Sequence, residues 1–460
     1  MGRNTVTQAY ASLTEAGLVS AHVGQGTFVA RRPGAPAGAA PAPARGFVWE
    51  SLFAAAGRPP RLPRPAAASE PRVRFDFRAG RVDGAALPRD ALRRAFARAT
   101  RELGTLANAM DPFGLRALRE EIARALVGRG VECGADDVLV TAGAQQALDL
   151  VARALLEPGD AVAVEQPGYF GAALAFEGRG ATLVPIGVDG EGLRTDELAR
   201  ALRARRMKLV YVTPAVQCPT GVVLSPGRRA ALLALADEHQ APILEDDYDA
   251  QLRLGARSTP ALAASDAAGQ VIHVGTFSKA LFPGLRIGYV VAAPPLRERL
   301  AQGALASCFG ASPLAQALLV ELVRGGAPGR HVRRMRRAYA EREAALAEAL
   351  ADALPEGASF VRPAGGTCLW LTLPPAINAA GVHERARSAG IAYARGESFF
   401  LDGRGAEHVL LSFACHPPAE LARGARELGA IVRDAGAERS AALPAACRTT
   451  GTCAAGGGMP

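Results

Sequence analysis

Short apolar runs alternate with longer amphipathic stretches between about residues 75 and 295. The apolar runs are 138–140, 161–164, 182–186, 209–212, 242–244, 271–274 and 288–291. Two of the longer stretches, 144–155 and 226–239, have the spacing of helices that bury one face. Apolar strands that alternate with helices predict an α/β domain with a mostly parallel seven-stranded sheet, covered on both faces. Ligands of such sheets bind at the carboxyl ends of the strands.

The first thirty residues follow a different pattern. An apolar residue recurs at helical spacing, at Val6, Tyr10 and Leu13. Gly17 predicts the end of this helix. Residues 18–21 then face 27–30 across a turn that contains glycine, which predicts a β-hairpin. We therefore expect a short helix followed by a wing-like hairpin.

Composition divides the rest of the chain. The residues after the hairpin are rich in Pro, Ala and Arg and favour an extended linker, with one short helix near 49–55. A charged helix near 330–350 and strands near 368–373 and 409–413 predict a smaller C-terminal α+β lobe. The predicted divisions are a partial first domain at 1–32, a linker at 33–72, a main domain at 73–432 with a large lobe at about 105–295 and a small lobe at about 73–104 and 296–432, and a disordered tail at 433–460.

The net charge of +9 is unevenly distributed. Residues 1–75 hold nine arginines against three glutamates, and the remainder is close to neutral. A basic leading segment is typical of a protein with a polyanion partner, although a solvated arginine-rich linker gives the same count. The charge by itself leaves these two interpretations open.

Nothing in the sequence directs the chain to a membrane or a secretory route. The least charged long stretch, 301–320, is interrupted by Gln, Gly and Pro, and the N-terminus lacks a basic segment followed by an apolar core. The seven cysteines are scattered, with no Cys-x-x-Cys pair. We expect a cytoplasmic protein with reduced cysteines, no membrane partner and no metal site.

Candidate chemistry begins with the lysines, of which the chain has only Lys208 and Lys279. Arginine keeps its proton and cannot form an imine, so a reaction that requires an amine has two candidates. Lys279 follows an apolar run, with Thr276 and Ser278 before it and Arg286 after it. An amine for an aldehyde, beside hydroxyl and guanidinium donors for a phosphate, suits pyridoxal 5′-phosphate. A surface lysine at a strand end is the alternative.

Three further strand ends carry polar or small residues. Asp246 could keep a pyridine nitrogen protonated and Tyr248 could hydrogen-bond a phenolic oxygen, whereas a divalent-cation site is the alternative for this acidic segment. Ala144 and Gln145 begin a helix after a tight turn, and their free N–H groups suit a phosphate. Tyr169 could stack on a pyridine ring. Taken singly, the turn and the tyrosine are equally explained by ordinary folding and packing.

Together and in this order, the four elements resemble the fold-type I aminotransferase family over residues 75–432. The resemblance implies a pyridoxal 5′-phosphate site with Lys279 as the Schiff-base lysine. The segment 213–221 resembles the family's Asn-Pro-Thr-Gly turn, with Cys218 at the asparagine position.

Residues 3–30 resemble the recognition helix and wing of GntR-superfamily winged helix-turn-helix domains. Joined by a linker to an aminotransferase-like body, this is the arrangement of the MocR-type regulators. The resemblance implies a homodimer, double-stranded DNA as a partner and a wing around 24–27 that lies against the DNA backbone. The residues it assigns to DNA contact are Arg3, Asn4, Thr5 and Gln8. The two helices that normally precede the recognition helix are missing, so we expect a truncated winged domain that results from a misassigned start site.

Two departures from the family bear on catalysis. Leu410 stands where aminotransferases usually have the arginine that binds the substrate α-carboxylate, and Ala109 stands where a tyrosine usually reaches the partner's phosphate. Arg362 and Arg395 are candidates to replace the missing arginine. We expect a regulator that senses pyridoxal 5′-phosphate, or its adduct with a small-molecule amine or amino acid. An active aminotransferase is the alternative, and a binding module without cofactor is a third interpretation.

Overall fold

The computed structural model describes residues 2–22, 24–30, 73–254, 259–375 and 377–442. The chain forms two compact units, Met1–Ala54 and Ala55–Pro460, and each is described by itself. The predicted linker at 33–72, with its short helix near 49–55, lies outside the described residues, as does the tail from 443 onward.

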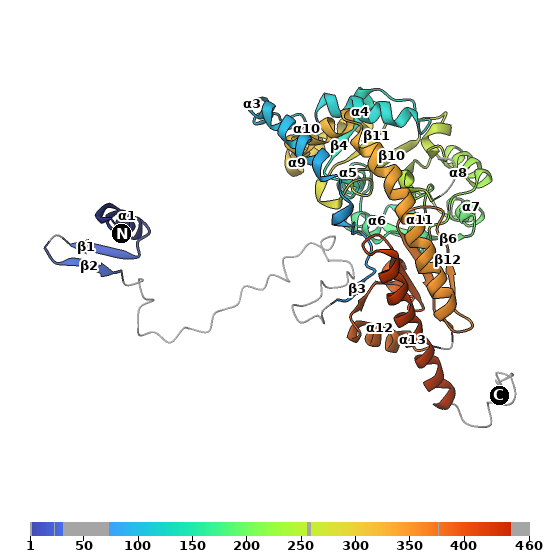
Figure 1. Ribbon diagram of the computed structural model, residues 1–460. Coiled ribbons are helices and arrows are strands. Elements are labelled where there is room, and N and C mark those ends of the chain that lie inside the picture. Colours follow the sequence, from blue (N-terminus) through green and yellow to red (C-terminus); the bar gives the residue numbers. More distant parts are fainter. Residues whose placement is uncertain (1, 23, 31–72, 255–258, 376, 443–460) are drawn as a thin grey trace, which may run out of the picture. The chain divides into compact units, whose positions relative to one another are not determined.

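The described residues of the first unit, 2–22 and 24–30, form one helix and one hairpin (Figure 1). Its elements are α1 (Arg3–Glu15), β1 (Val19–His22) and β2 (Gly26–Val29). Gly17 ends the helix at a positive φ of 65° and donates its N–H to Thr14, while the N–H of Leu18 binds the carbonyl of Leu13. None of the α1 residues is buried. Local turn chemistry therefore accounts for this unit, and its described residues contain no core.

The second unit is built on a large twisted sheet (Figure 1). In spatial order its strands are β4 (Val138–Thr141), β11 (Gly288–Val291), β10 (Val271–Thr276), β9 (Ile243–Asp246), β8 (Leu209–Val212), β5 (Ala161–Gln166), β6 (Thr182–Asp189) and β7 (Gly192–Leu193). The strands from β10 to β6 are parallel, whereas β11 is antiparallel to both of its neighbours. The seven predicted strands are all present.

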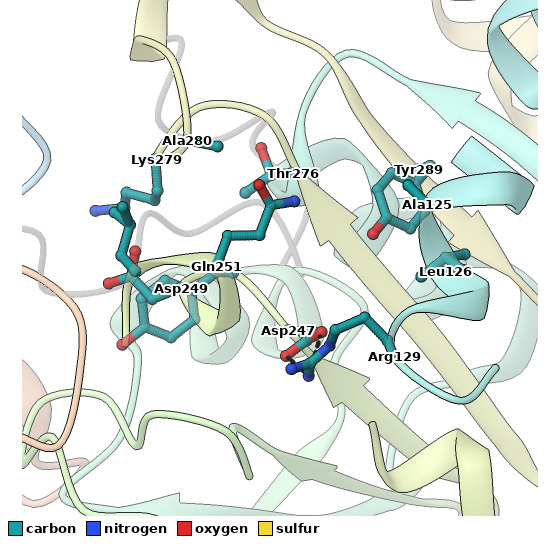
Figure 2. Close-up of a pocket in the computed structure, with 12 residues that line it drawn as sticks. Ala125, Leu126, Arg129, Asp247, Asp249, Gln251, Thr276, Lys279, Ala280 and Tyr289 are labelled. Atoms are coloured by element: carbon teal, nitrogen blue, oxygen red, sulfur yellow. Dashed lines mark hydrogen bonds and ion pairs between the residues drawn. The ribbon is translucent and has the colours of Figure 1, made fainter. Parts of the chain in front are cut away.

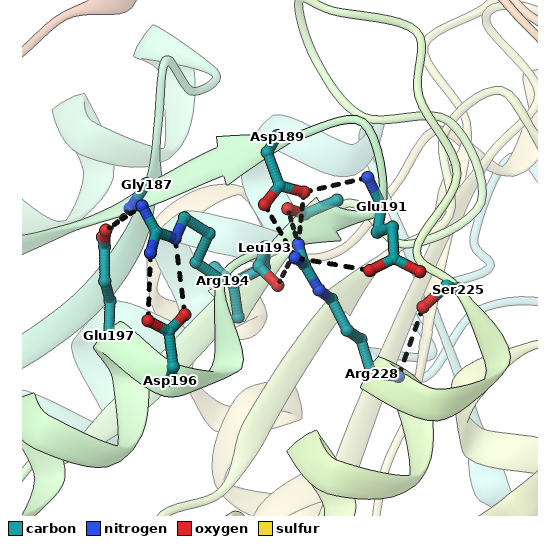
Figure 3. Close-up of polar contacts among 10 residues, drawn as sticks. Gly187, Asp189, Glu191, Leu193, Arg194, Asp196, Glu197, Ser225 and Arg228 are labelled. Atoms are coloured by element: carbon teal, nitrogen blue, oxygen red, sulfur yellow. Dashed lines mark hydrogen bonds and ion pairs between the residues drawn. The ribbon is translucent and has the colours of Figure 1, made fainter.

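The eighth strand, β7, was not predicted. It has only two residues and pairs with the end of β6 after a tight turn. Arg228, from a helix distant in sequence, holds this turn by pairing with Asp189 at 2.6 Å and donating to the carbonyls of Gly192 at 2.7 Å and Leu193 at 3.2 Å (Figure 3). Because a long-range contact organises the turn, no local apolar pattern indicates it.

Helices cover both faces of the large sheet. They are α2 (Arg89–Ala99), α3 (Leu103–Leu106), α4 (Arg116–Val127), α5 (Ala144–Leu155), α6 (Phe170–Glu177), α7 (Thr195–Ala204), α8 (Pro226–His239), α9 (Pro294–Cys308) and α10 (Pro313–Arg324). On β5, Val162 and Val164 pack with α5, α6 and α9, whereas Ala161 and Ala163 pack with α7 and α8. This alternation is the two-residue period of a strand buried on both faces.

The small lobe has its own sheet and two long helices. Its elements are β3 (Phe75–Asp76), α11 (Ala327–Ala353), β12 (Ser359–Val361), β13 (Cys368–Thr372), α12 (Ala379–Ser388), β14 (Ile391–Ala392), β15 (Ala394–Arg395), β16 (His408–Ser412) and α13 (Pro418–Ala442). The four-stranded sheet has the order β12-β13-β16-β15, and β3 pairs with β14. The first described strand of the second unit thus packs in the lobe that is formed mainly by residues after 326.

The lobe boundaries differ from the predicted ones. We assigned α2, α9 and α10 to the small lobe, but α2 and α10 share a core with β4 and α4, and α9 shares one with α5. These three helices therefore belong with the large sheet. A helical pattern shows which face is apolar and does not show which element that face will contact.

The tail predicted to begin at residue 433 is helical up to Ala442. It continues α13, whose side chains Leu428, Val432 and Ala435 are buried in the small-lobe core against α11. These apolar positions, four and three residues apart, keep the helix attached to the core after the point where the composition becomes polar. Within the described ranges, no helix is both long and apolar enough to cross a membrane.

Candidate functional site

Lys279 follows β10 at the carboxyl edge of the large sheet. Its ammonium nitrogen lies 5.8 Å from the centre of the Tyr248 ring, and Asp249 lies beside it (Figure 2). Burial lowers the pKa of Lys279, but the Asp249 carboxylate raises it, and the net pKa is above the ordinary lysine value. Thr276 accepts the N–H of Ser278 at 3.2 Å through its hydroxyl oxygen, which shapes the turn before the lysine. The structure therefore holds this partly buried amine in an acidic environment.

Asp246 ends the neighbouring strand, β9, and is 3% exposed. Its Oδ2 accepts a 2.9 Å hydrogen bond from the hydroxyl of Tyr211, whereas its Oδ1 is buried and has no hydrogen-bond partner among the described residues. Burial raises the pKa of Asp246 to about 7. A buried carboxylate oxygen without a donor is costly, and a ring N–H is the type of donor that would satisfy it.

Two other acidic residues of this segment, Asp247 and Glu245, have partners. Asp247 forms two hydrogen bonds with Arg129, at 2.9 and 3.0 Å (Figure 2). Glu245 binds His273 at 2.9 Å. No group of three or more described His, Cys, Asp or Glu side chains could hold a metal ion. The geometry therefore gives no support to the alternative of a divalent-cation site.

The start of α5 and Arg286 form the third part of this edge. Gly143 precedes α5 with a φ of 90°, and no side chain caps the helix. Arg286 is exposed and donates to the carbonyl of Ala142 at 2.7 Å. A Cβ atom at Gly143 would lie 2.9 Å from the Arg286 guanidinium, so glycine leaves room for this approach. The N–H groups of Ala144 and Gln145 and one guanidinium together suit a phosphate group.

Tyr169 follows β5 at the same edge. Its hydroxyl donates to the side-chain oxygen of Gln145 at 3.1 Å, and the side-chain amide of Gln145 donates to the carbonyl of Gly171 at 2.7 Å. The side chain of Gln145 thus orients the loop that bears Tyr169. Only the backbone N–H of Gln145 is then available to a ligand. We call the group made by Asp246, Lys279 and Arg286 the cofactor side.

Sequence reasoning missed Tyr211 and Glu165. Glu165 is 4% exposed, burial raises its pKa to about 7, and it accepts hydrogen bonds from Thr213 and Gln217. Gln217 also donates to the carbonyl of Pro167 at 2.9 Å. Glu165 and Gln217 therefore connect the loop that bears the aromatic ring with the turn that follows β8. The sequence contained a signal for both residues. Tyr211 carries a hydroxyl within the apolar run 209–212, and Glu165 directly follows the apolar run 161–164.

Leu410 lies in a small apolar cluster, which we define as Trp370, Phe399 and Leu410. All three side chains are buried, and the partly buried thiols Cys218 and Cys368 pack against them. Leu410 stands where aminotransferases usually have the arginine that binds the substrate α-carboxylate. The structure surrounds this position with apolar side chains.

The two arginines proposed as replacements are both paired. Arg362 makes two hydrogen bonds with Glu343, at 2.8 and 2.6 Å, and Arg395 pairs with Glu397. Neither one offers an uncommitted guanidinium to a ligand. Ala109 lies in the turn after α3.

The residues expected to contact DNA lie in the first unit. They occupy the first two turns of α1 and are all exposed: Arg3, Asn4, Thr5 and Gln8. These side chains are therefore accessible to a ligand.

Comparison with known proteins identifies the family. The model of aminotransferase class I and II matches residues 75–428. The chain belongs to the class I and II aminotransferase family. The predicted fold-type I fold is confirmed, and the cofactor is pyridoxal 5′-phosphate. The residues of this chain fit that cofactor. The Asp246 oxygen without a partner suits its ring nitrogen, and the close approach of Arg286 to Gly143 suits its phosphate.

Relatives within this aminotransferase family include both enzymes and regulators. A 2-aminoadipate transaminase of Thermus thermophilus is 33% identical over 350 residues, which are 75% of this chain and 87% of that protein. The probable rhizopine catabolism regulatory protein MocR of Rhizobium meliloti is 35% identical over 352 residues, 75% of this chain and 68% of that protein. The crystal structure of the α-aminoadipate aminotransferase LysN of Thermus thermophilus, complexed with N-(5′-phosphopyridoxyl)-L-leucine, has a TM-score of 0.79 and 31% identity, and covers 85% of this chain and 100% of its own. Family membership therefore does not choose between catalysis and regulation.

Proposed function

We propose that this protein is a homodimeric, DNA-binding transcription regulator whose aminotransferase-like domain binds pyridoxal 5′-phosphate and senses it, or its adduct with an amine or amino acid. One observation carries the proposal. The cofactor side is complete, whereas an apolar cluster stands where turnover of an α-amino acid would need a cation. The similarity to the regulator MocR supports the same conclusion.

Each residue of the cofactor side has a proposed role. When bound, pyridoxal 5′-phosphate supplies an aldehyde and an electron-withdrawing ring. Lys279 would provide the amine, and Asp246 would accept a hydrogen bond from the ring nitrogen while Tyr211 holds its other oxygen. Tyr248 would hydrogen-bond the phenolic oxygen, and Tyr169 would stack on the ring. The groups that would hold the phosphate are the N–H groups of Ala144 and Gln145, the hydroxyls of Thr276 and Ser278, and the guanidinium of Arg286.

Asp249 completes the chemistry around the amine. It is 5% exposed, and its charge favours the protonated form of Lys279. A carboxylate in this place would orient the ammonium group of Lys279 by charge. Sequence reasoning had not assigned Asp249 a role.

The leading segment supplies the DNA contact in this proposal. The first turns of α1 present Arg3, Asn4, Thr5 and Gln8 to a major groove, and the basic charge of residues 1–75 attracts the phosphate backbone. A change of ligand in the aminotransferase-like domains of the dimer would then alter the relation between its two DNA-binding segments.

The decisive experiment measures both activities on the full chain. We expect the holoprotein to shift promoter DNA in a gel, with an affinity that changes when an amine is added, and to convert amino donors slowly. Rapid turnover of an amino donor without DNA affinity would instead support the second candidate, an active aminotransferase. That candidate is favoured by the Asp249 and Asp246 charges that act on Lys279 and by the similarity to LysN.

A further inference from the structure

A cavity of about 890 Å³ lies between α6 and residues 393–403. Its aromatic lining is Tyr169, Phe170, Tyr211, Tyr393, Phe399 and Phe400. Tyr169 carries the proposed stacking ring, and Tyr211 binds Asp246. The cavity therefore opens beside the cofactor position, and its volume is in the range of small-molecule sites.

Four ionisable side chains line this cavity: Glu165, Glu177, Glu397 and Arg395. Arg395 is paired with Glu397, and burial raises the pKa of Glu165 to about 7. The described lining therefore offers aromatic faces, which attract a cationic nitrogen, and no uncommitted cation for a carboxylate.

The apolar cluster borders the cavity. Phe399 belongs to the cluster and to the cavity lining. Cys218 and Cys368 pack against the cluster, and the charge of Lys279 acts on both thiols. A ligand that extends from Lys279 into the cavity thus meets thiols and apolar side chains, with no cation positioned for an α-carboxylate in the described part of this region.

We propose that the cavity takes an aromatic primary amine that lacks an α-carboxylate, with its ring among the aromatic side chains and its nitrogen directed to Lys279. This inference rests on the proposed function, because it names the ligand class of the same site. A carboxylate in this place would lose its water and gain no charged partner, so it reduces affinity.

The test uses two ligands that differ only in the carboxylate. Phenethylamine and L-phenylalanine are titrated calorimetrically into the holoprotein. We expect phenethylamine to bind at least about tenfold more tightly. Equal or tighter binding of L-phenylalanine overturns the inference.

Two variants place a cation in the region. Leu410→Arg should reverse the preference toward L-phenylalanine, but Leu410 is 3% exposed and the variant can misfold. Leu401→Arg avoids this problem, because Leu401 lines the cavity and is 38% exposed. It should weaken phenethylamine binding and strengthen L-phenylalanine binding severalfold. Leu305→Arg, at a 41% exposed position on α9 outside the cavity, is the matched control and should leave both affinities unchanged.

The same samples separate the two levels of the argument. If the protein with added cofactor shows no visible absorbance band, the proposed function fails. If the band is present and L-phenylalanine binds as well as phenethylamine, or Leu401→Arg has no effect, the ligand class alone is wrong.

Discussion

The cofactor side and the apolar cluster border one site and differ in polarity and charge. The cofactor side has a buried carboxylate with an orphaned oxygen, an amine in an acidic environment and an exposed guanidinium. The apolar cluster offers rings, a leucine and two thiols. A fold that retains an amine, a carboxylate and a guanidinium for the cofactor but presents apolar side chains at the position of the carboxylate-binding arginine is suited to binding and sensing. The following predictions test this contrast, from the largest expected effect to the smallest.

Removing the amine of Lys279 should abolish covalent binding of the cofactor. Lys279→Ala should abolish the visible absorbance band and the covalent label that borohydride fixes, since no other described amine lies at this edge. The second lysine provides the control: Lys208 precedes β8 at the opposite end of the strands, and Lys208→Ala should keep both signals. A label that persists in Lys279→Ala would contradict the assignment.

Glu165 lies beneath the loop that bears Tyr169, and its burial predicts a pH effect on the stability of the apoprotein. Burial raises its pKa from 4.5 to about 7, so the folded state retains a proton that the unfolded chain releases. The stabilising contribution is complete below about pH 4.5 and is lost as the pH rises through 7, a change of about 3 kcal/mol. Denaturant titrations at pH 5 and 7 should show a smaller fall in stability for Glu165→Gln than for wild type.

Glu356→Gln, at an exposed position, is the control for this measurement and should match wild type. Asp246 has the same direction of shift, so part of the pH dependence should remain in Glu165→Gln. An identical fall in Glu165→Gln and wild type would show that Glu165 is charged in the folded protein.

Arg286 tests whether the guanidinium holds the phosphate. Arg286 has a φ of 51°, so glycine can replace it without backbone strain. Arg286→Gly should weaken pyridoxal 5′-phosphate binding about 10- to 100-fold, because charge-assisted hydrogen bonds are lost. Fluorescence titration of the apoprotein measures this, and an unchanged melting temperature without cofactor would exclude a folding defect.

The smallest expected effect is on the stability of the first unit, which belongs to neither the cofactor side nor the apolar cluster. Gly17→Ala forces alanine into a positive φ of 65° and should destabilise the end of α1 by about 1 kcal/mol. Faster amide exchange within residues 3–18 should report it, with no change in the absorbance of the bound cofactor. A slower exchange would mean that the turn differs from the one described.

Local signals predicted much of the molecule. The bounds of α5 and α8 agree with the predicted helices 144–155 and 226–239, because their apolar spacing and terminal residues are local. The strand ends that carry Asp246, Tyr169 and Lys279 were predicted to meet, since parallel strands share a carboxyl edge. The strand β7 and the attachment of α9 and α10 to the large sheet were not, because distant residues determine them.

The order of residues along the chain by itself determined the fold class, the two-unit organisation and the amine that could bind an aldehyde. Only the tertiary structure decided that Arg362 and Arg395 are committed to Glu343 and Glu397, and that Leu410 lies among aromatic rings. The reason is that periodicity and residue type can be read from neighbours in sequence. The ion pair that a charged side chain forms, and the residues that a side chain contacts, depend on parts of the chain that meet only when it folds.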